Sequence, residues 1–248
     1  MIRIRGLMKR LGRKQVLNGL DLDVQAGETL VVLGPSGCGK SVLLKHIIGL
    51  MQPDGGSIEI EGEDIAGMDE AELDRVRKRF GMLFQSAALF DSMSVGENVG
   101  LTLREHLRLG DRDVQARVAE RLEWVGLKGT EDLRTASLSG GMRKRVGLAR
   151  AVAMDPQYIL YDEPTTGLDP ITADVINRMI RGLQQRLGVT SIVVTHDLVS
   201  AYHVADRMAM MYGGKVVFTG TPEETRHTAD PMVRQFIEGS STGPIQPV

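Results

Sequence analysis

One eight-residue stretch, from Gly34 to Ser41, constrains the fold of this chain more than any other feature. It reads GPSGCGKS and matches the pattern G-x-x-x-x-G-K-[ST], in which a glycine-rich turn joins a buried strand to a helix. The apolar run Thr29–Leu33 precedes it, and a helix is expected from Ser41 to Leu50. Glycines let successive backbone N–H groups converge on phosphate oxygens, and the start of a helix adds partial positive charge. The stretch therefore predicts a loop that binds nucleotide phosphates.

Every residue of this loop is a candidate for nucleotide binding. We expect Lys40 to place its charge against the β- and γ-phosphates of ATP, and the Ser41 hydroxyl to bind Mg²⁺. A chance glycine-rich turn is the alternative, but it would not require the flanking strand and helix. The candidates are Gly34, Pro35, Ser36, Gly37, Cys38, Gly39, Lys40 and Ser41.

A second buried strand, predicted from Tyr158 to Tyr161, ends in two carboxylates, Asp162 and Glu163. The carboxyl ends of parallel strands face the ligand crevice, so both side chains are expected to turn toward a nucleotide. Asp162 is predicted to hold Mg²⁺ or its water, and Glu163 to accept a proton from the attacking water. The alternative is an exposed acidic turn, because a proline follows directly.

A third strand, predicted from Ser191 to Thr195, is followed by His196. Its imidazole is a candidate for a hydrogen bond to a γ-phosphate or to the attacking water. A structural histidine is the alternative. The other four histidines have no comparable setting, and we assign them no role.

The order of the predicted elements indicates the fold class. Apolar strands alternate with helices, which predicts a mainly parallel sheet covered by helices on both faces. Residues 1–33 are expected to be β-structure, and residues from about 86 to 157 to be helical. Residues 239–248 are rich in Gly, Ser and Pro and are expected to form an irregular tail.

The composition excludes several function classes. The formal net charge of −2 gives no support for a nucleic-acid partner. Cys38 is the single cysteine, so no disulfide can form within the chain. The first five residues alternate apolar and charged, which predicts a strand rather than a signal peptide. Since no uninterrupted apolar run approaches about 18 residues, any work at a membrane is expected to depend on partner chains.

Further motifs give the chain a family resemblance. The sequence LSGGM at Leu138–Met142 resembles the LSGGQ signature of ATP-binding-cassette (ABC) ATPases, and it lies just before the Asp162–Glu163 strand, as in that family. Pro164–Asp169 resembles the family's D-loop, Gln85 its Q-loop glutamine, and His196 its switch histidine. The ordered motifs cover residues 1 to about 225.

The resemblance implies a fold and a domain organisation. It implies an α/β P-loop NTPase of the RecA-like type, with a parallel sheet core, an N-terminal antiparallel β region and an inserted α-helical subdomain at about 86–157. The nucleotide-binding domain would span residues 1–238, before the tail at 239–248.

The resemblance also implies a mechanism, hydrolysis of ATP with Mg²⁺ by a head-to-tail dimer. Each ATP would lie between the P-loop of one copy and the signature of the other. Ser139, Gly140 and Gly141 would present the positive end of a helix to the γ-phosphate. Asp169 would join the nucleotide-binding residues, Gln85 would join Ser41 and Asp162 at the Mg²⁺ ion, and Glu163 and His196 would be catalytic.

Softer features narrow the resemblance to one branch of the family. Met142 where glutamine is usual, the segment 75–90 and the tail segments 233–239 and 243–244 resemble the ATPase of Mla-type phospholipid transporters. That resemblance implies an integral-membrane permease and an MCE-domain lipid-binding protein as partners. It implies a peripheral location on the cytoplasmic face of the bacterial inner membrane, through the permease. An ABC importer for a polar solute such as an amino acid is the alternative.

Three segments carry narrower expectations. Arg10–Arg13 offers no aromatic ring to stack on adenine, as such families usually have near position 11. Most of Arg143–Arg145 is expected to be a solvated helix face. Ser86–Val99 is unusually apolar for a loop. In ABC ATPases this region forms the groove that receives a permease helix, which predicts exposure of Leu89 and Phe90; packing inside the helical subdomain is the alternative.

Overall fold

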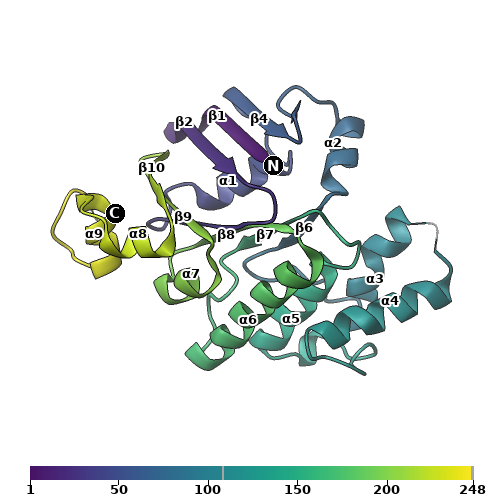
Figure 1. Cartoon of the computed structure of the whole chain (residues 1–248). Coiled ribbons are helices and arrows are strands. Elements are labelled where there is room, and N and C mark those ends of the chain that lie inside the picture. Colours follow the sequence, from purple (N-terminus) through teal and green to yellow (C-terminus); the bar gives the residue numbers. More distant parts are fainter. Residues whose placement is uncertain (108, 247–248) are drawn as a thin grey trace. The chain divides into compact units, whose positions relative to one another are not determined.

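The computed structural model describes residues 1–107 and 109–246, so the last two residues of the expected tail lie outside the described residues. The chain forms two compact units, residues 1–73 with 192–248, and residues 74–191. The chain passes from one unit to the other within helix α2 (Glu70–Arg77) and again within strand β8 (Thr190–Thr195), both labelled in Figure 1. Within the described ranges, no helix has the length and apolar character needed to cross a bilayer.

An antiparallel sheet occupies the N-terminal part of the first unit, as the sequence predicts. Its strand order is β2-β1-β4-β5, and Ile2 lies opposite both Val24 and Ile60. Ile2 and Ile4 are buried while Arg3 and Arg5 are exposed, so the alternating pattern places one face of β1 in the core. The strands are β1 (Ile2–Leu11), β2 (Lys14–Val24), β4 (Gly55–Ile60) and β5 (Glu63–Asp64).

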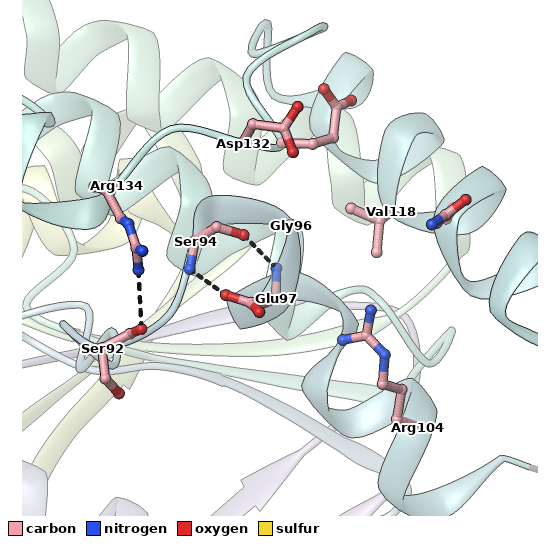
Figure 2. A pocket seen from close by; sticks show the side chains of 10 residues that line it. Ser92, Ser94, Gly96, Glu97, Arg104, Val118, Asp132 and Arg134 are labelled. Atoms are coloured by element: carbon pink, nitrogen blue, oxygen red, sulfur yellow. Dashed lines mark hydrogen bonds between the residues drawn. The ribbon is translucent and has the colours of Figure 1, made fainter.

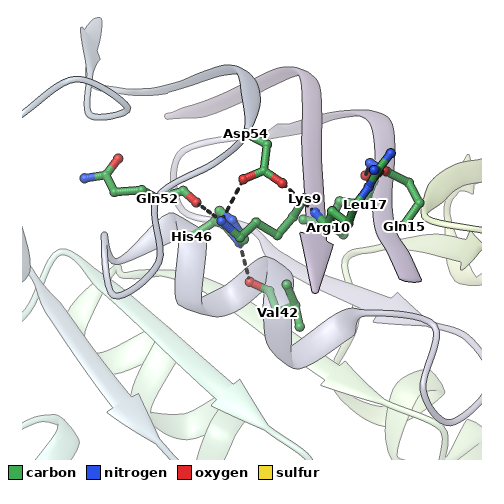
Figure 3. A network of polar contacts seen from close by, with 8 residues as sticks. All are labelled: Lys9, Arg10, Gln15, Leu17, Val42, His46, Gln52 and Asp54. Atoms are coloured by element: carbon green, nitrogen blue, oxygen red, sulfur yellow. Dashed lines mark hydrogen bonds and ion pairs between the residues drawn. The ribbon is translucent and has the colours of Figure 1, made fainter. Parts of the chain in front are cut away.

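A polar network joins strand β1 to the loop before β4, next to helix α1 (Lys40–Ile47) (Figure 3). The Lys9 ammonium donates to the Gln52 carbonyl at 2.6 Å and pairs with Asp54 at 2.9 Å. Asp54 also accepts from the Arg10 backbone N–H at 2.6 Å. His46, buried on α1, donates from Nδ1 to the Val42 carbonyl at 2.8 Å, and burial lowers the pKa of its imidazole. The helix that follows the glycine-rich loop ends at Ile47, three residues earlier than predicted.

The remaining strands of the first unit surround β3 (Thr29–Leu33), all of whose residues are buried. Strand β9 (Arg207–Tyr212) pairs with β3 in parallel, with Leu33 opposite Met210, and β8 is the next strand on the other side. Strand β10 (Lys215–Gly220) returns antiparallel beside β9. The sequence patterns found β3 and β8 but not this hairpin.

Helices α7 (Leu198–Val204), α8 (Pro222–His227) and α9 (Pro231–Glu238) complete the first unit. Residues 239–246 form no helix or strand. They are nevertheless held, because the Gln235 side chain accepts from the Ile245 N–H at 2.6 Å and donates to its carbonyl at 3.0 Å. Ile245 packs with Met210 and Val233 in a small apolar cluster.

The second unit combines two parallel strands with helices. Strand β6 (Phe80–Leu83) pairs with β7 (Tyr158–Asp162), with Phe80 opposite Tyr158 and their rings stacked at 4.8 Å. Helices α3 (Val95–His106), α4 (Asp111–Trp124) and α5 (Gly140–Ala151) pack together, and α5 also contacts α6 (Pro170–Leu187). The expected helical stretch at 86–157 thus consists of α3, α4, a short 3₁₀ turn at Thr135–Ser137 and α5, joined by loops.

Helix α5 approaches β6 so closely that a side chain at Gly81 would meet backbone, and one at Gly147 would meet the side chains of Leu83 and Ala87. A Cβ atom on Gly81 would lie 2.0 Å from the Ala151 carbonyl oxygen. A Cβ atom on Gly147 would lie 2.6 Å from Leu83 Cδ1 and 3.3 Å from Ala87 Cβ. The backbone of α5 therefore rests directly on the end of β6 and on the residues that follow it.

We expect Gly81→Ala to lower the free energy of unfolding, because the added methyl must displace backbone rather than a flexible side chain. Overpacking of this kind typically costs about 1–3 kcal/mol. Gly182→Ala is the matched control: a methyl group there would meet nothing within 4 Å, and alanine favours a helix interior by about 0.5–1 kcal/mol. The measurement is the denaturant midpoint of each variant. An unchanged midpoint for Gly81→Ala would contradict the close approach.

Candidate nucleotide-binding site

The glycine-rich loop begins where β3 ends, and its backbone is tightly enclosed. A Cβ atom on Gly34 would lie 2.3 Å from the Met211 carbonyl oxygen on β9. Gly39 is the N-cap of α1, with φ of 107°, and a Cβ there would lie 3.0 Å from Val16. Because the N-cap is a glycine, it has no side chain that would cover the first amides of α1. These amides are the groups that bind phosphate in loops of this pattern.

Lys40 and Ser41 open helix α1 directly after this turn. Lys40 is buried, and its ammonium donates to the carbonyls of Gly34 at 2.8 Å and Pro35 at 3.2 Å. The side chain therefore folds back over the loop that it is predicted to serve. A second cation, Lys14, donates to the Gly37 carbonyl at 3.3 Å, so two positive charges border the same turn.

His196 lies at the end of β8, the strand next to β3 in the first unit. Its side chain is exposed. The following residue, Asp197, caps α7 by accepting from the Val199 N–H at 3.0 Å, and its own N–H donates to Thr195 Oγ1 at 3.0 Å. In the first unit, the glycine-rich loop follows β3 and His196 follows the adjacent strand β8. The hydrogen bonds of Asp197 fix the backbone next to His196.

The second unit brings Asp162, Glu163 and Gln85 to one edge. Asp162 ends β7, and the parallel pairing of Leu83 with Tyr161 puts Gln85 beyond the same end of β6. Asp162 and Glu163 are each only 8% exposed, which excludes the exposed acidic turn. Glu163 has φ of 47°, a conformation that costs a non-glycine residue about 1–3 kcal/mol. Its Oε2 accepts from Thr166 Oγ1 at 3.2 Å.

Lys144 connects these residues from helix α5. Its ammonium donates to the Gln85 carbonyl at 2.5 Å and to the Glu163 carbonyl at 3.1 Å, and the side chain is buried. Burial lowers the pKa of Lys144 to about 8, while the negative charges of Asp162 and Glu163 oppose the shift. The expectation was a solvated face for most of Arg143–Arg145, and Lys144 is the member that turns inward. A charge run gives no signal of which member turns inward.

Arg150, further along α5, holds the next part of the same segment. Its guanidinium donates to the carbonyls of Ala87 and Ala88, at 2.7 Å each. Both alanines have positive φ, 63° and 45°, in the region that non-glycine residues rarely adopt. The turn after Gln85 is thus held in a left-handed conformation by two cations of one helix. No sequence signal pointed to Arg150.

The signature segment forms the N-terminus of α5, as its resemblance implies. Ser139 is the N-cap and accepts from the Met142 N–H at 3.2 Å, while Ser139 and Gly140 are exposed. Gly141 is buried, and a Cβ there would lie 2.6 Å from Thr172 on α6. The first turn of α5 contains no acidic residue, so its partial positive charge is not offset locally.

Asp169 caps α6 and is fully engaged in that role. Its carboxylate accepts from Thr172 Oγ1 at 2.6 Å and from the N–H groups of Ile171 and Thr172 at 3.0 Å each. The hydrogen bonds from Thr172 lower the pKa of Asp169. The structure therefore gives Asp169 a capping role beside the nucleotide contact expected for it.

Two cavities of the second unit contain none of the predicted site residues. A polar pocket of about 590 Å³ is bordered by the start of α3, where Ser94 and Glu97 form a reciprocal capping box and Arg134 donates to the Ser92 carbonyl at 3.2 Å (Figure 2). An apolar groove of about 390 Å³ has a lining that includes Phe84, Ala88, Phe90, Leu101 and Met154.

Phe90 borders this apolar groove and is 50% exposed. Its backbone is fixed, because its N–H donates to Asn98 Oδ1 at 2.8 Å and its carbonyl accepts from Asn98 Nδ2 at 3.1 Å. Ala87 and Val95 are buried, so the apolar stretch after Gln85 is divided between core and surface. The expected exposure therefore holds for Phe90, whereas Leu89 is only partly exposed.

Comparison with known proteins places this arrangement in a family. Residues 17–166 match the profile of the ABC transporter family. The chain is 42% identical over 246 residues to the intermembrane phospholipid transport system ATP-binding protein MlaF of Haemophilus influenzae, covering 99% of this chain and 93% of that protein. It is 43% identical over 244 residues to the probable ribonucleotide transport ATP-binding protein mkl of Mycobacterium leprae, covering 98% of this chain and 70% of that protein.

Solved structures give the same assignment. A dimeric ATP-binding cassette in a post-hydrolysis state, bound to ADP and phosphate, has a TM-score of 0.83 and 30% identity, covering 90% of this chain and 99% of that chain. The cbiO1 subunit of a Clostridium perfringens ABC transporter complex has a TM-score of 0.83 and 28% identity, covering 97% and 94%. These matches confirm the P-loop cassette fold that the motifs predict, and the chain belongs to the ATP-binding subunits of the ABC transporter family.

Proposed function

We propose that this ABC ATPase powers the transport of phospholipid between the bacterial inner membrane and the cell envelope. The observation that carries the substrate is the 42% identity to MlaF over 99% of this chain and 93% of that protein. The mkl relatives, whose name refers to ribonucleotides, favour a polar solute as the second candidate, but this chain spans only 68–70% of their length.

We assign the chemical roles residue by residue. The loop Gly34–Ser41 binds the phosphates, with Lys40 as the charge that neutralises them. Ser41, Gln85 and Asp162 offer hydroxyl, amide and carboxylate oxygens, and oxygen ligands fit Mg²⁺. That ion, when bound, neutralises the negative charge that develops on the phosphates. Glu163 accepts the proton of the attacking water, and His196 orients the γ-phosphate or that water.

We propose that the signature acts on the nucleotide of a second copy. The capped start of α5 is exposed at Ser139 and Gly140 and carries partial positive charge, so it is available to a γ-phosphate held by another chain. Gly141 and Asp169 fix its place, because both α5 and the cap of α6 meet at Thr172. A head-to-tail dimer with two such interfaces satisfies closed symmetry.

We propose that a permease helix occupies the apolar groove beside Phe90, which would place the chain at the cytoplasmic face of the inner membrane. A half-exposed phenylalanine at the edge of a groove of about 390 Å³ is a feature of surfaces that a partner covers. An MCE-domain protein is the proposed third partner, on the basis of the resemblance to Mla-type systems.

We expect Glu163→Gln to bind ATP but to hydrolyse it about 10²- to 10⁴-fold more slowly, the usual contribution of a general base. The amide keeps the shape of the side chain and loses the capacity to accept the proton. Steady-state phosphate release and ATP titration measure the two effects. Glu105→Gln, an exposed change of the same chemistry on α3, is the control. Turnover of Glu163→Gln within a few-fold of the parent would rule out the assigned role.

We expect the complex of this chain with its permease to move phospholipid in an ATP-dependent manner. Proteoliposomes that hold the complex and a fluorescent phosphatidylglycerol would lose or gain that lipid after ATP is added. The same proteoliposomes with Glu163→Gln in place of the parent chain would not. Mass spectrometry of the purified complex should find phospholipid bound. ATPase stimulation by a ribonucleotide or an amino acid, with no lipid movement, would favour the polar-solute importer instead.

We expect Phe90→Asp to abolish co-purification of the permease while leaving the thermal melt of the isolated chain unchanged. The aspartate charge would have to be buried under the partner helix, which prevents binding. The isolated chain should stay folded, because Asn98 binds only the backbone of residue 90, which the substitution leaves in place. Leu133→Asp is the control, since Leu133 is similarly exposed, at 42%, outside the groove. An unchanged permease yield would refute the interface, and a collapsed melt would support core packing.

A further inference from the structure

Lys144 is the point at which three functional segments of the second unit meet. It belongs to α5, the helix whose first residues are the signature, and its ammonium donates both to the Gln85 carbonyl at 2.5 Å and to the Glu163 carbonyl at 3.1 Å. An ammonium has three donors, and two of them are directed at backbone oxygens of residues with assigned roles. Lys144 is only 5% exposed, so water does not readily replace these bonds.

The geometry of the two acceptors gives these bonds a specific effect. Glu163 has φ of 47°, so its side chain leaves the strand end in a direction that an extended residue would not give it. Gln85 begins the left-handed turn at Ala87 and Ala88, whose carbonyls Arg150 holds. Both segments would relax toward common backbone conformations if their carbonyls were released. Packing of Gly147 against Leu83 and Ala87 keeps the helix at the distance that this bridge requires.

We propose that Lys144 is a positioning residue for hydrolysis, which holds the backbone of Glu163 and that of Gln85 in fixed register with the signature helix. It does not touch the reacting atoms itself. Its effect is on the direction of the Glu163 carboxylate, so it acts on the chemical step rather than on nucleotide affinity. This role rests on the proposed function of Glu163 as the general base.

The test is a comparison of kcat and KM for ATP among variants of the full chain. Lys144→Met removes the donors and the charge at nearly constant length, and Lys144→Arg keeps both. We expect Lys144→Met to lower kcat by about 10-fold or more with KM within about 3-fold of the parent, since small misplacements of a reacting group cost up to about 10²-fold. Lys144→Arg should recover most of kcat. Arg145→Met, which removes the neighbouring charge, should match the parent.

Each outcome bears on the positioning role. Parent-like kcat in Lys144→Met overturns it, and so does a fall in kcat that is matched by an equal rise in KM. If Lys144→Met melts below the assay temperature, Lys144→Gln takes its place, because a glutamine amide is too short to reach both carbonyls. Reduced kcat at unchanged KM in that variant supports the positioning role, and parent-like kcat overturns it.

Glu163→Gln, measured beside these variants, separates the positioning role from the general-base assignment. An inactive Glu163→Gln with a fully active Lys144→Met overturns the positioning role alone. An active Glu163→Gln overturns the general-base assignment, and with it the basis for a positioning role.

Discussion

The close approach of helix α5 to strand β6 is the constraint on which the arrangement of Gln85, Lys144 and Glu163 in the second unit depends. Gly81 lets the two backbones meet, because a Cβ atom there would lie 2.0 Å from the Ala151 carbonyl oxygen, and Gly147 leaves space for the Leu83 side chain. At that distance a lysine and an arginine from one helix reach backbone carbonyls that a more distant helix could not contact. The hydrogen bonds from Lys144 and Arg150 to these carbonyls therefore depend on the close packing of α5 against β6.

Close backbone packing also holds the glycine-rich loop of the first unit in place. Its loop is enclosed by backbone, since the Met211 carbonyl leaves no space for a side chain at Gly34. Lys40 folds over the turn, and its ammonium donates to the Gly34 carbonyl at 2.8 Å. A phosphate-binding loop needs its amides directed before the ligand arrives, and enclosure of this kind supplies that order without any bound group.

The sequence predicted the parts of this site that depend on residue type at fixed spacing. The loop at 34–41, the carboxylates after Tyr161 and the serine before Gly140 were all found in this way, together with the strands at β3, β7 and β8. Each of these signals is local, because glycine permits backbone conformations that other residues avoid, and a short apolar run bounded by a turn predicts a buried strand wherever it occurs. The β9–β10 hairpin was missed, since the run Arg207–Tyr212 is rich in methionine rather than in β-branched residues.

The inward turn of Lys144 could not be predicted, because it is decided by which face of α5 meets β6. Arg143, Lys144 and Arg145 look alike in the sequence, yet only the middle one is buried. The left-handed pair Ala87–Ala88 was equally hidden, since alanine carries no preference for positive φ. Both features arise from contacts between segments far apart in the chain, and local patterns carry no information about those.

The segment from Gln85 to Phe90 runs from the proposed Mg²⁺ ligand to the proposed permease groove. Lys144 holds its first carbonyl, Arg150 holds those of Ala87 and Ala88, and Asn98 holds both backbone groups of Phe90. A six-residue segment fixed at so many points has few ways to deform internally. Lys144 thus links the backbone of this segment to that of Glu163, and the groove at Phe90 lies at the other end of the same segment.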